Sequence, residues 1–336
     1  MSKRWSQARA KHWYDEQPWL IGCNFIPSTA INQLEMWQAD TFDLATIDRE
    51  LGWAAGLGFN TVRVYLHDLL WLADADGLLE RINQYLTVAS KHGIRTTLVF
   101  FDACWNNYGY LGKQPQPIPG VHNSGWLQSP TGKVLVDGSA WGRLEAYVVG
   151  VMDYLRDDER VLMWDLYNEP GNEGYLESSF PLLQAVFAWA RRVNPAQPLT
   201  VGVWDEGSAF ERLNQFQLEH SDIITFHNYE PLESLERQMT ALQSYDRPLI
   251  CTEYMARTRG SYFATHVPVF KDARVGCYNW GLVAGKTQTQ YPWYSSQGRP
   301  EPELWYHDIF YSDGTPYDET EVNVIKATTA PDVVHR

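Results

Sequence analysis

The chain has 336 residues and is 44% hydrophobic, which is enough for one large α/β domain with a sizeable core. Its 27 basic and 41 acidic side chains give a formal net charge of −14, so nucleic acids and anionic membranes are not expected as partners. The four cysteines form no Cys-x-x-Cys pair, which argues against a zinc site or a redox pair. At the start of the chain, residues 1–18 are polar and hold neither a signal peptide nor a membrane span, which predicts a cytoplasmic protein.

An amphipathic helix, a Gly or Asn, and a β-branched strand follow one another repeatedly along the chain. Such helices are predicted at Asp48–Leu57, Ile82–His92 and Leu182–Val193, and a last helix at Asp318–Ala327. Strands that alternate with helices form a parallel sheet. The predicted strands are Leu20–Asn24, Thr61–Tyr65, Arg95–Phe101, Val161–Tyr167, Leu199–Trp204, Ile223–His227, Pro248–Glu253 and Val275–Trp280.

Eight βα units in one chain predict a closed (β/α)8 TIM barrel, which belongs to the α/β class. An open doubly wound sheet would carry a Gly-rich phosphate-binding turn after its first strand, where this chain has Cys-Asn-Phe-Ile-Pro at residues 23–27. We therefore expect a single catalytic domain over residues 1–336. The barrel is expected at about 18–328, and a frayed C-terminal tail at 329–336.

Two connections are much longer than the others. One runs from Asp102 to about Ser139 after the third strand, and the other from Gly281 to about Pro316 after the eighth. Long loops in a compact domain are usually functional, and both leave from the C-terminal ends of strands, where barrel enzymes carry their sites. We expect them to form the walls of a deep cleft.

The fourth strand ends in Asn168-Glu169-Pro170. Because Pro170 cannot extend a central strand, Glu169 is predicted at the C-terminal tip of a buried strand. Alone, the motif fits a loop with a solvated acid equally well, but the seventh strand ends in Glu253, across the barrel mouth. Glycosidic bonds are cleaved by two carboxyl groups, and a separation of about 5 to 5.5 Å would mean retention of configuration.

Polar and aromatic side chains from other strands and loops are predicted to reach the same rim. They are Arg63, His67 and Asp68, Asp102 and Trp105, His227 and Tyr229, and Trp280 at strand ends, with His122, Asn123, Trp126, Lys286 and Trp293 on the long loops. The chain has 15 Trp, and flat aromatic faces stack on sugar rings, although a Trp-rich core would account for at least half of them. Purely structural roles also stay open for Arg63 as an ion pair, His227 as a buried core residue and Trp280 as packing.

These motifs together resemble the barrel glycoside hydrolases of the cellulase family, family 5 and its clan. The matching motifs are Arg63, Asn168-Glu169-Pro170, His227-Asn228-Tyr229, Thr252-Glu253-Tyr254 and Asn279-Trp280, in the family's order along the barrel. The resemblance implies that Glu169 is the acid/base and Glu253 the nucleophile. It also implies that Asn168 binds the sugar 2-hydroxyl and that Trp280 forms the floor of subsite −1. Arg63 and Tyr229 would flank Glu253, and His227 would line the same subsite.

The expected charges agree with these roles. Arg63 and a tyrosine hydroxyl beside Glu253 would favour its ionised form, as a nucleophile requires. Glu169 is expected to be held protonated by partial burial and by repulsion from the nearby carboxylate of Glu253.

Two segments differ from the usual pattern of a secreted endoglucanase. Glu35 and Trp37, after the first strand, are predicted either to hold hydroxyls and a ring in subsite −1 or to begin the first helical region. Lys286, after the eighth strand, is either a ligand of a substrate hydroxyl or anionic substituent or a solvated loop residue. These segments leave the sugar unidentified.

The favoured function is a retaining β-glycoside hydrolase that acts on β-linked oligosaccharides without a cofactor or metal, by exo action or on short chains. The alternatives are an endo-acting glucanase, mannanase or xylanase, and a non-catalytic carbohydrate-binding barrel. A metal-dependent barrel hydrolase would draw its ligands from His67, Asp68, Asp102, His122 and His227. The oligomeric state is left open.

Overall fold

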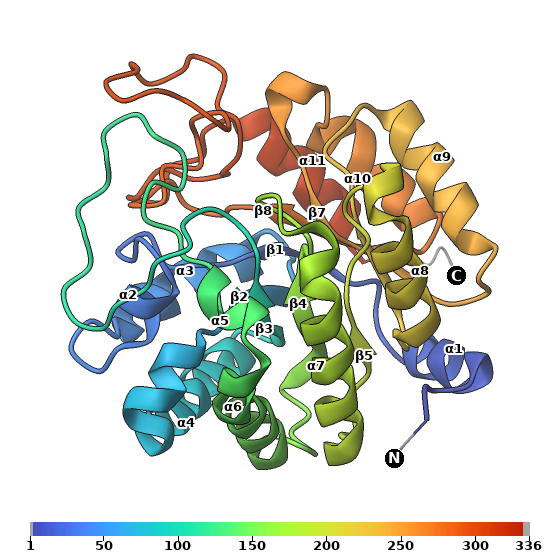
Figure 1. The fold of residues 1–336 in the computed structure, drawn as a ribbon. Coiled ribbons are helices and arrows are strands. Elements are labelled where there is room, and N and C mark those ends of the chain that lie inside the picture. Colours follow the sequence, from blue (N-terminus) through green and yellow to red (C-terminus); the bar gives the residue numbers. More distant parts are fainter. Residues whose placement is uncertain (1–2, 332–336) are drawn as a thin grey trace.

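The computed structural model describes residues 3–331, and they form eight parallel strands surrounded by helices (Figure 1). The strands are β1 Ile21–Asn24, β2 Thr61–Tyr65, β3 Arg95–Asp102, β4 Val161–Asn168, β5 Leu199–Thr200, β6 Ile224–His227, β7 Leu249–Tyr254 and β8 Gly276–Trp280. Their order in the sheet is β5-β4-β3-β2-β1-β8-β7-β6, so that β1 and β8 pair and the sheet curls into a barrel. The predicted single-domain (β/α)8 barrel is thereby confirmed.

Helices follow every strand, as the alternating pattern predicts. They are α1 Gln7–Asp15, α2 Gln33–Trp37, α3 Leu44–Gly56, α4 Asp68–Lys91, α5 Gly132–Val136, α6 Trp141–Tyr154, α7 Phe180–Val193, α8 Glu211–His220, α9 Leu232–Gln243, α10 Phe263–Asp272 and α11 Glu319–Thr329, with short 3-10 turns η1 Gly138–Ala140, η2 Leu176–Ser179, η3 Ser208–Phe210 and η4 Arg257–Arg259. The helix predicted at 82–92 is only the second part of α4, which begins at Asp68 and is kinked at Asp74. Helix α5 lies within the segment 102–139 that was expected to be a loop.

The fifth strand is shorter than predicted. It was expected to run from 199 to 204 but ends at Thr200, and the chain then continues without a regular ladder. The barrel closes between β5 and β6 through Val203, whose N–H donates to Thr225 O (3.0 Å) and whose carbonyl accepts from His227 N (2.9 Å). Gly202 interrupts the strand here, and glycine within a strand weakens regular pairing.

The end of the barrel opposite the long loops is covered by α1. Trp5, Ala10 and Tyr14 are buried there against residues from the lower ends of the strands, among them Leu162 and Ile250. The backbone N–H of Trp5 also donates to Asp222 Oδ1 (2.7 Å). The N-terminal segment, which the sequence left without structure, therefore closes the bottom of the barrel.

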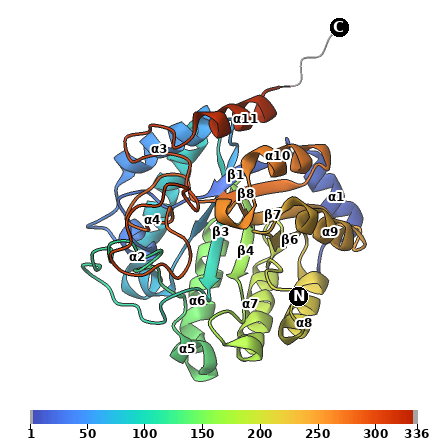
Figure 2. The ribbon, with the colours of Figure 1, turned by 90° about the horizontal axis from the view of Figure 1, so that it is seen from above.

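The long connections, here named loop 3 (residues 103–131) and loop 8 (residues 281–318), lie side by side over one part of the barrel mouth. Figure 2 shows them on the side of α2 and α4. Gln288 joins them, since its Nε2 donates to Ile118 O (2.7 Å) and Val121 O (3.0 Å) and its Oε1 accepts from Gly120 N (3.0 Å). The expectation that they form walls at the strand C-termini agrees with this position.

Among the described residues, no helix combines the length and the apolar character needed to cross a bilayer. The cytoplasmic location stays a prediction. Most of the predicted tail at 329–336 lies outside the described residues, which end at residue 331. Its first residue, Thr329, is the last residue of α11.

Candidate active site

A cavity of about 530 Å³ opens at the C-terminal ends of the strands. Cavities of roughly 300 to 1,000 Å³ are typical of small-molecule sites. Eleven of the side chains expected at the rim line it: Trp105, His122, Asn123, Trp126, Asn168, Glu169, His227, Tyr229, Glu253, Trp280 and Trp293. The strand ends therefore converge on one place, as the barrel geometry requires.

Glu169 is the first residue after β4 and has a positive φ of 48°. Every residue of β4 is buried, and the turn into Pro170 directs the Glu169 side chain toward the cavity. Its Oε1 lies 2.8 Å from His227 Nδ1. Its Oε2 accepts from Asn172 Nδ2 (2.6 Å) and from the Cys104 thiol (3.1 Å).

Glu253 lies within β7 and is bonded on both carboxylate oxygens. Oε1 accepts from Arg63 Nη1 (2.8 Å) and from the Tyr65 hydroxyl (2.9 Å). Oε2 accepts from the Tyr229 hydroxyl (2.7 Å). An ionised carboxylate is acceptor-only, so three donors directed at one carboxyl group fit its ionised form.

His227 lies between the two glutamates. One carboxylate oxygen of Glu169, one of Glu253 and one ring nitrogen of His227 all lie within 4.8 Å of one another. The nearest oxygen of Glu253 is 3.6 Å from His227 Nδ1. The two carboxyl groups are therefore close enough to act on opposite sides of one glycosidic bond.

Burial raises the pKa of Glu169, but the hydrogen bond and charge of His227 outweigh it, and the bonds from Cys104 and Asn172 add to their effect. Together they hold the pKa below its usual value. The expectation that Glu169 is held protonated is wrong for this structure. The sequence did not place an imidazole and two further donors against this carboxyl group, and these decide its protonation.

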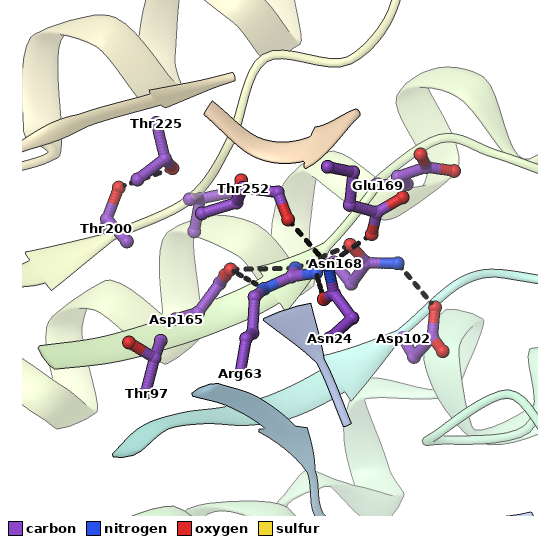
Figure 3. A network of polar contacts seen from close by, with 12 residues as sticks. Asn24, Arg63, Thr97, Asp102, Asp165, Asn168, Glu169, Thr200, Thr225 and Thr252 are labelled. Atoms are coloured by element: carbon purple, nitrogen blue, oxygen red, sulfur yellow. Dashed lines mark hydrogen bonds and ion pairs between the residues drawn. The ribbon is translucent and has the colours of Figure 1, made fainter. Parts of the chain in front are cut away.

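Arg63 forms the base of the site (Figure 3). Its Nε donates to Asp165 Oδ2 (2.9 Å), its Nη1 to Asn24 Oδ1 (2.8 Å) and its Nη2 to Asn168 Oδ1 (2.7 Å). Arg63 also donates to Glu253, so its guanidinium forms ion pairs with two carboxylates, those of Asp165 and Glu253. The Arg63 side chain is fully buried. The sequence left open whether Arg63 forms a structural ion pair or flanks Glu253. Arg63 does both, since it pairs with Asp165 and with Glu253.

Asp102 does not line the cavity but supports residues that do. It accepts from Asn168 Nδ2 (3.0 Å) and from the Trp126 indole N–H (2.6 Å). Burial raises its pKa to about 7. Asn168 is thus fixed between Arg63 on one side and Asp102 on the other, as Figure 3 shows.

The floor of the cavity is aromatic. The rings of Trp280 and Tyr65 lie 5.9 Å apart and those of Trp280 and Trp126 5.6 Å apart, both in edge-on geometry. Trp280 is 9% exposed, so it both packs in this cluster and reaches the cavity. Trp105 forms part of a side wall, with φ at 69°.

Besides Arg63 and Asp102, four residues named as possible substrate ligands lie outside the cavity lining, and this role is corrected for them. For Glu35 and Trp37 the other alternative, the first helical region, is the one observed, since both lie in α2. Lys286 Nζ pairs with Glu35 Oε1 (2.6 Å), and Glu35 Oε2 accepts from Ile31 N (2.7 Å), so these charges hold loop 8 to the start of α2. Trp37 is fully buried, with its indole N–H bonded to Tyr65 O (2.9 Å).

His67, the fourth of them, is the N-cap of α4. Its Nδ1 accepts from Leu69 N (3.2 Å), and the side chain is fully buried. Trp37 and His67 are therefore structural residues. Sequence position alone could not separate these buried side chains from those at the rim.

Several residues of the site were not found from the sequence. Tyr65 stands two positions after Arg63 on β2, and the alternation of strand side chains would have placed both inside the barrel. Asp165 is a lone acid in the apolar β4, a pattern that demands a buried partner. Cys104 and Asn172 follow the strands in irregular chain, and no pattern pointed to them.

The proposed metal ligands of the alternative reading do not converge. Among the described residues, the one group of His, Cys, Asp and Glu side chains that could hold a metal ion is Glu169, His227 and Glu253. A cation there would have to displace the Arg63 guanidinium, 2.8 Å from Glu253, or share the carboxylate with it. The arrangement fits proton transfer and nucleophilic attack better than metal coordination.

No family model and no curated protein sequence matches the chain. Among solved structures, the chain is similar to GH5_18 from Streptomyces cattleya in complex with GlcNAc, with a TM-score of 0.62 and 13% identity over 92% of this chain and 79% of that one. It is also similar to the exo-beta-1,4-mannosidase Op5Man5 from Opitutaceae bacterium strain TAV5, with a TM-score of 0.62 and 17% identity over 92% of this chain and 59% of that one. A third is the endo-beta-1,4-mannanase from Thermotoga petrophila, with a TM-score of 0.59 and 14% identity over 94% and 78%. At these identities the likeness concerns the barrel fold.

Proposed function

We propose that the chain is a retaining β-glycoside hydrolase with Glu253 as nucleophile and Glu169 as acid/base. The observation that carries this proposal is the carboxylate pair at the ends of β4 and β7, in which one oxygen of Glu169 lies within 4.8 Å of one oxygen of Glu253. Retaining enzymes keep their carboxyl groups about 5 to 5.5 Å apart, whereas inverting enzymes need about 6.5 to 9.5 Å to admit a water. The short separation favours double displacement.

In the first step, Glu253 attacks the anomeric carbon, and the bond to the leaving oxygen breaks as Glu169 gives that oxygen a proton. Glu169 and His227 can hold this proton between them, since Nδ1 and Oε1 lie 2.8 Å apart. In the second step, water attacks the glycosyl–Glu253 ester at the anomeric carbon while Glu169 takes its proton. Glu253 leaves as a carboxylate, which Arg63, Tyr65 and Tyr229 stabilise.

The proposal includes exo action or action on short chains. Loops 3 and 8 are joined through Gln288 and close one side of the barrel mouth, which would leave no path for a polymer on that side. An endo-acting glycanase is the alternative. Oligosaccharides of defined length would separate the two, because exo action releases one unit at a time and endo action gives internal fragments first.

The catalytic assignment is tested with a panel of aryl β-glycosides. β-Mannosides stand first, because two of the similar structures are named for mannosidase or mannanase activity. The Glu253→Ala variant is expected to lose roughly 10⁴-fold or more in kcat with an unchanged circular dichroism spectrum. Near-native activity of this variant on every glycoside that the wild type cleaves would contradict the proposal.

The Glu169→Ala variant tests the acid/base role separately. Its activity is expected to fall steeply on phenyl glycosides, whose leaving group needs a proton, and much less in the glycosylation of dinitrophenyl glycosides, whose leaving group does not. Added azide should restore turnover of the dinitrophenyl glycoside and give a β-glycosyl azide. In the Glu253→Ala variant, azide should instead give the α-product, because it enters from the face that Glu253 has vacated.

A further inference from the structure

His122 and Asn123 line the cavity on loop 3 and hold polar atoms without a partner in the protein. The unpartnered atoms are His122 Nε2 and both the Oδ1 and Nδ2 of Asn123. The two residues are only 2% and 1% exposed. A buried polar group without a hydrogen bond costs free energy, so three such atoms on two consecutive residues that line a cavity suggest a ligand.

The tautomer of His122 follows from its other ring nitrogen. Nδ1 lies 2.7 Å from Tyr291 O, and because a carbonyl only accepts, Nδ1 carries the proton. Burial lowers the pKa of His122 to about 4, so the ring is neutral near pH 7. Nε2 then presents a lone pair to its surroundings and can only accept a hydrogen bond.

Loop 8 fixes both residues in place. The backbone N–H of His122 donates to Ser295 Oγ (3.1 Å), and that of Asn123 donates to Thr287 O (2.8 Å). The Trp105 ring lies 5.2 Å from the His122 ring and restricts its orientation. The backbone of both residues and the His122 ring are therefore held before a ligand arrives, which lowers the entropy cost of binding.

We propose that His122 and Asn123 form a specificity subsite for the hydroxyl groups of an uncharged sugar at the closed side of the cavity. A sugar hydroxyl donates its one proton to His122 Nε2 and can accept from Asn123 Nδ2, while a neighbouring hydroxyl donates to Asn123 Oδ1. A carboxylate or an ether oxygen at this place has no proton to give to Nε2, so uronic acids and O-alkylated sugars are disfavoured. This inference rests on the proposed glycosidase function and specifies its substrate.

The test uses the aryl β-glycoside that the wild type cleaves best and its monodeoxy analogues. One analogue is expected to lose roughly 10-fold to 100-fold in kcat/KM with the wild type, the cost of leaving a buried group unpaired. The His122→Ala variant should lose a similar factor on the parent glycoside, mainly through KM. It should lose no further factor on that analogue, because the missing hydroxyl and the missing imidazole belong to one contact.

Two further variants keep the test decisive if His122→Ala folds poorly. Asn123→Gly removes the amide without strain at the positive φ of 48°, and should show the same coupling with the same or the adjacent deoxy position. His67→Ala is the matched control, because His67 is also fully buried and has an unpartnered Nε2, but does not line the cavity. It should lower stability and leave the preference among deoxy analogues unchanged.

Equal losses on the parent and on every analogue with both cavity variants would overturn the subsite, as would a preference of the wild type for uronosides. These outcomes are distinct from a failure of the proposed function. If Glu253→Ala is inactive while the subsite variants show no coupling, only the subsite is wrong. If Glu253→Ala remains active, the catalytic assignment fails first.

Discussion

Glu169 and Glu253 are both carboxyl groups in one cavity, but their partners differ in kind. Glu253 accepts from a guanidinium that is always charged and from two tyrosine hydroxyls. Glu169 meets an imidazole, a thiol and an amide. The partners of Glu253 hold it as an anion, whereas the imidazole beside Glu169 can exchange a proton with it. This difference supports the two proposed roles more strongly than strand position does.

Cys104 offers a direct probe of the acid/base residue. Its thiol donates to Glu169 Oε2 at 3.1 Å and so helps to hold the pKa of Glu169 low. In Cys104→Ala this donor is lost, the ionised form of Glu169 is less stable, and its pKa rises. Since the first step needs protonated Glu169, the alkaline limb of kcat/KM should move to higher pH by roughly half a unit to one unit.

The pH profile of kcat/KM measures this shift. Cys104→Ser is the control, because a serine hydroxyl keeps a donor at this place and should leave the alkaline limb close to its original position. An alkaline limb that moves to lower pH in Cys104→Ala, or that stays fixed, would contradict the assignment of Glu169.

At the level of strands and loops, the apolar runs predicted all eight strands, and seven of them to within two residues at either end. A parallel strand buried on both faces reads as a near-continuous apolar run that stops at a breaker, so its limits can be seen in the sequence. β5 differs because it ends at Thr200, and the barrel closes beyond it through the isolated hydrogen bonds of Val203, which no periodicity encodes.

Some side chains at the barrel rim could be predicted from the sequence and others could not. Glu169 and Glu253 follow directly from strand ends, and Tyr65 could have been added from its spacing to Arg63. For Trp37 the sequence could not decide between a ligand and the first helical region, where it lies, since a tryptophan in the core and one at a cavity look alike in sequence. The contacts between loops 3 and 8 could not be predicted, because they join residues far apart in the chain without any repeat or pattern.

The junction of loops 3 and 8 can be tested through Gln288. Gln288→Ala removes three hydrogen bonds to Ile118, Gly120 and Val121. Losing bonds of about 1 kcal/mol each should loosen the cavity wall, raise KM for short glycosides roughly tenfold and speed cleavage of loop 3 in limited proteolysis. Gln297→Ala, an exposed glutamine on the same loop, is the control. Unchanged KM and proteolysis in Gln288→Ala would show that the junction does not shape the site.

Across the whole molecule, buried carboxyl groups and buried histidines make the free energy of unfolding depend on pH in opposite directions. Burial raises the pKa of Glu50, Asp102 and Asp308 to about 7, so their contribution is full at acid pH and is lost as pH rises through about 7. Burial lowers the pKa of His122 and His307, so the stability that depends on their neutral state is lost as pH falls below about 6.5.

Substituting one of these groups isolates its contribution to the pH dependence of the free energy of unfolding. Glu50 is fully buried beneath Ser28, whose N–H and hydroxyl both donate to it. Glu50→Gln cannot ionise, so its free energy of unfolding relative to the wild type should rise between pH 5 and pH 8. A pKa raised from 4.5 to about 7 sets this gain at roughly 3 kcal/mol at most.

Urea unfolding at a series of pH values measures the difference. Glu80→Gln, at an exposed acid on α4, should differ from the wild type by the same amount at every pH. A relative stability of Glu50→Gln that falls from pH 5 to pH 8 would contradict the sign.

The central claim is that Glu169 and Glu253 act together by double displacement. Proton NMR of the reaction mixture, recorded within the first minutes before the product equilibrates, shows which anomer forms first. With one oxygen of each carboxylate within 4.8 Å of the other, we expect a β-glycoside to release the β-anomer first. If the α-anomer is released first, the reaction is a single displacement by water, and the account of the two glutamates is wrong.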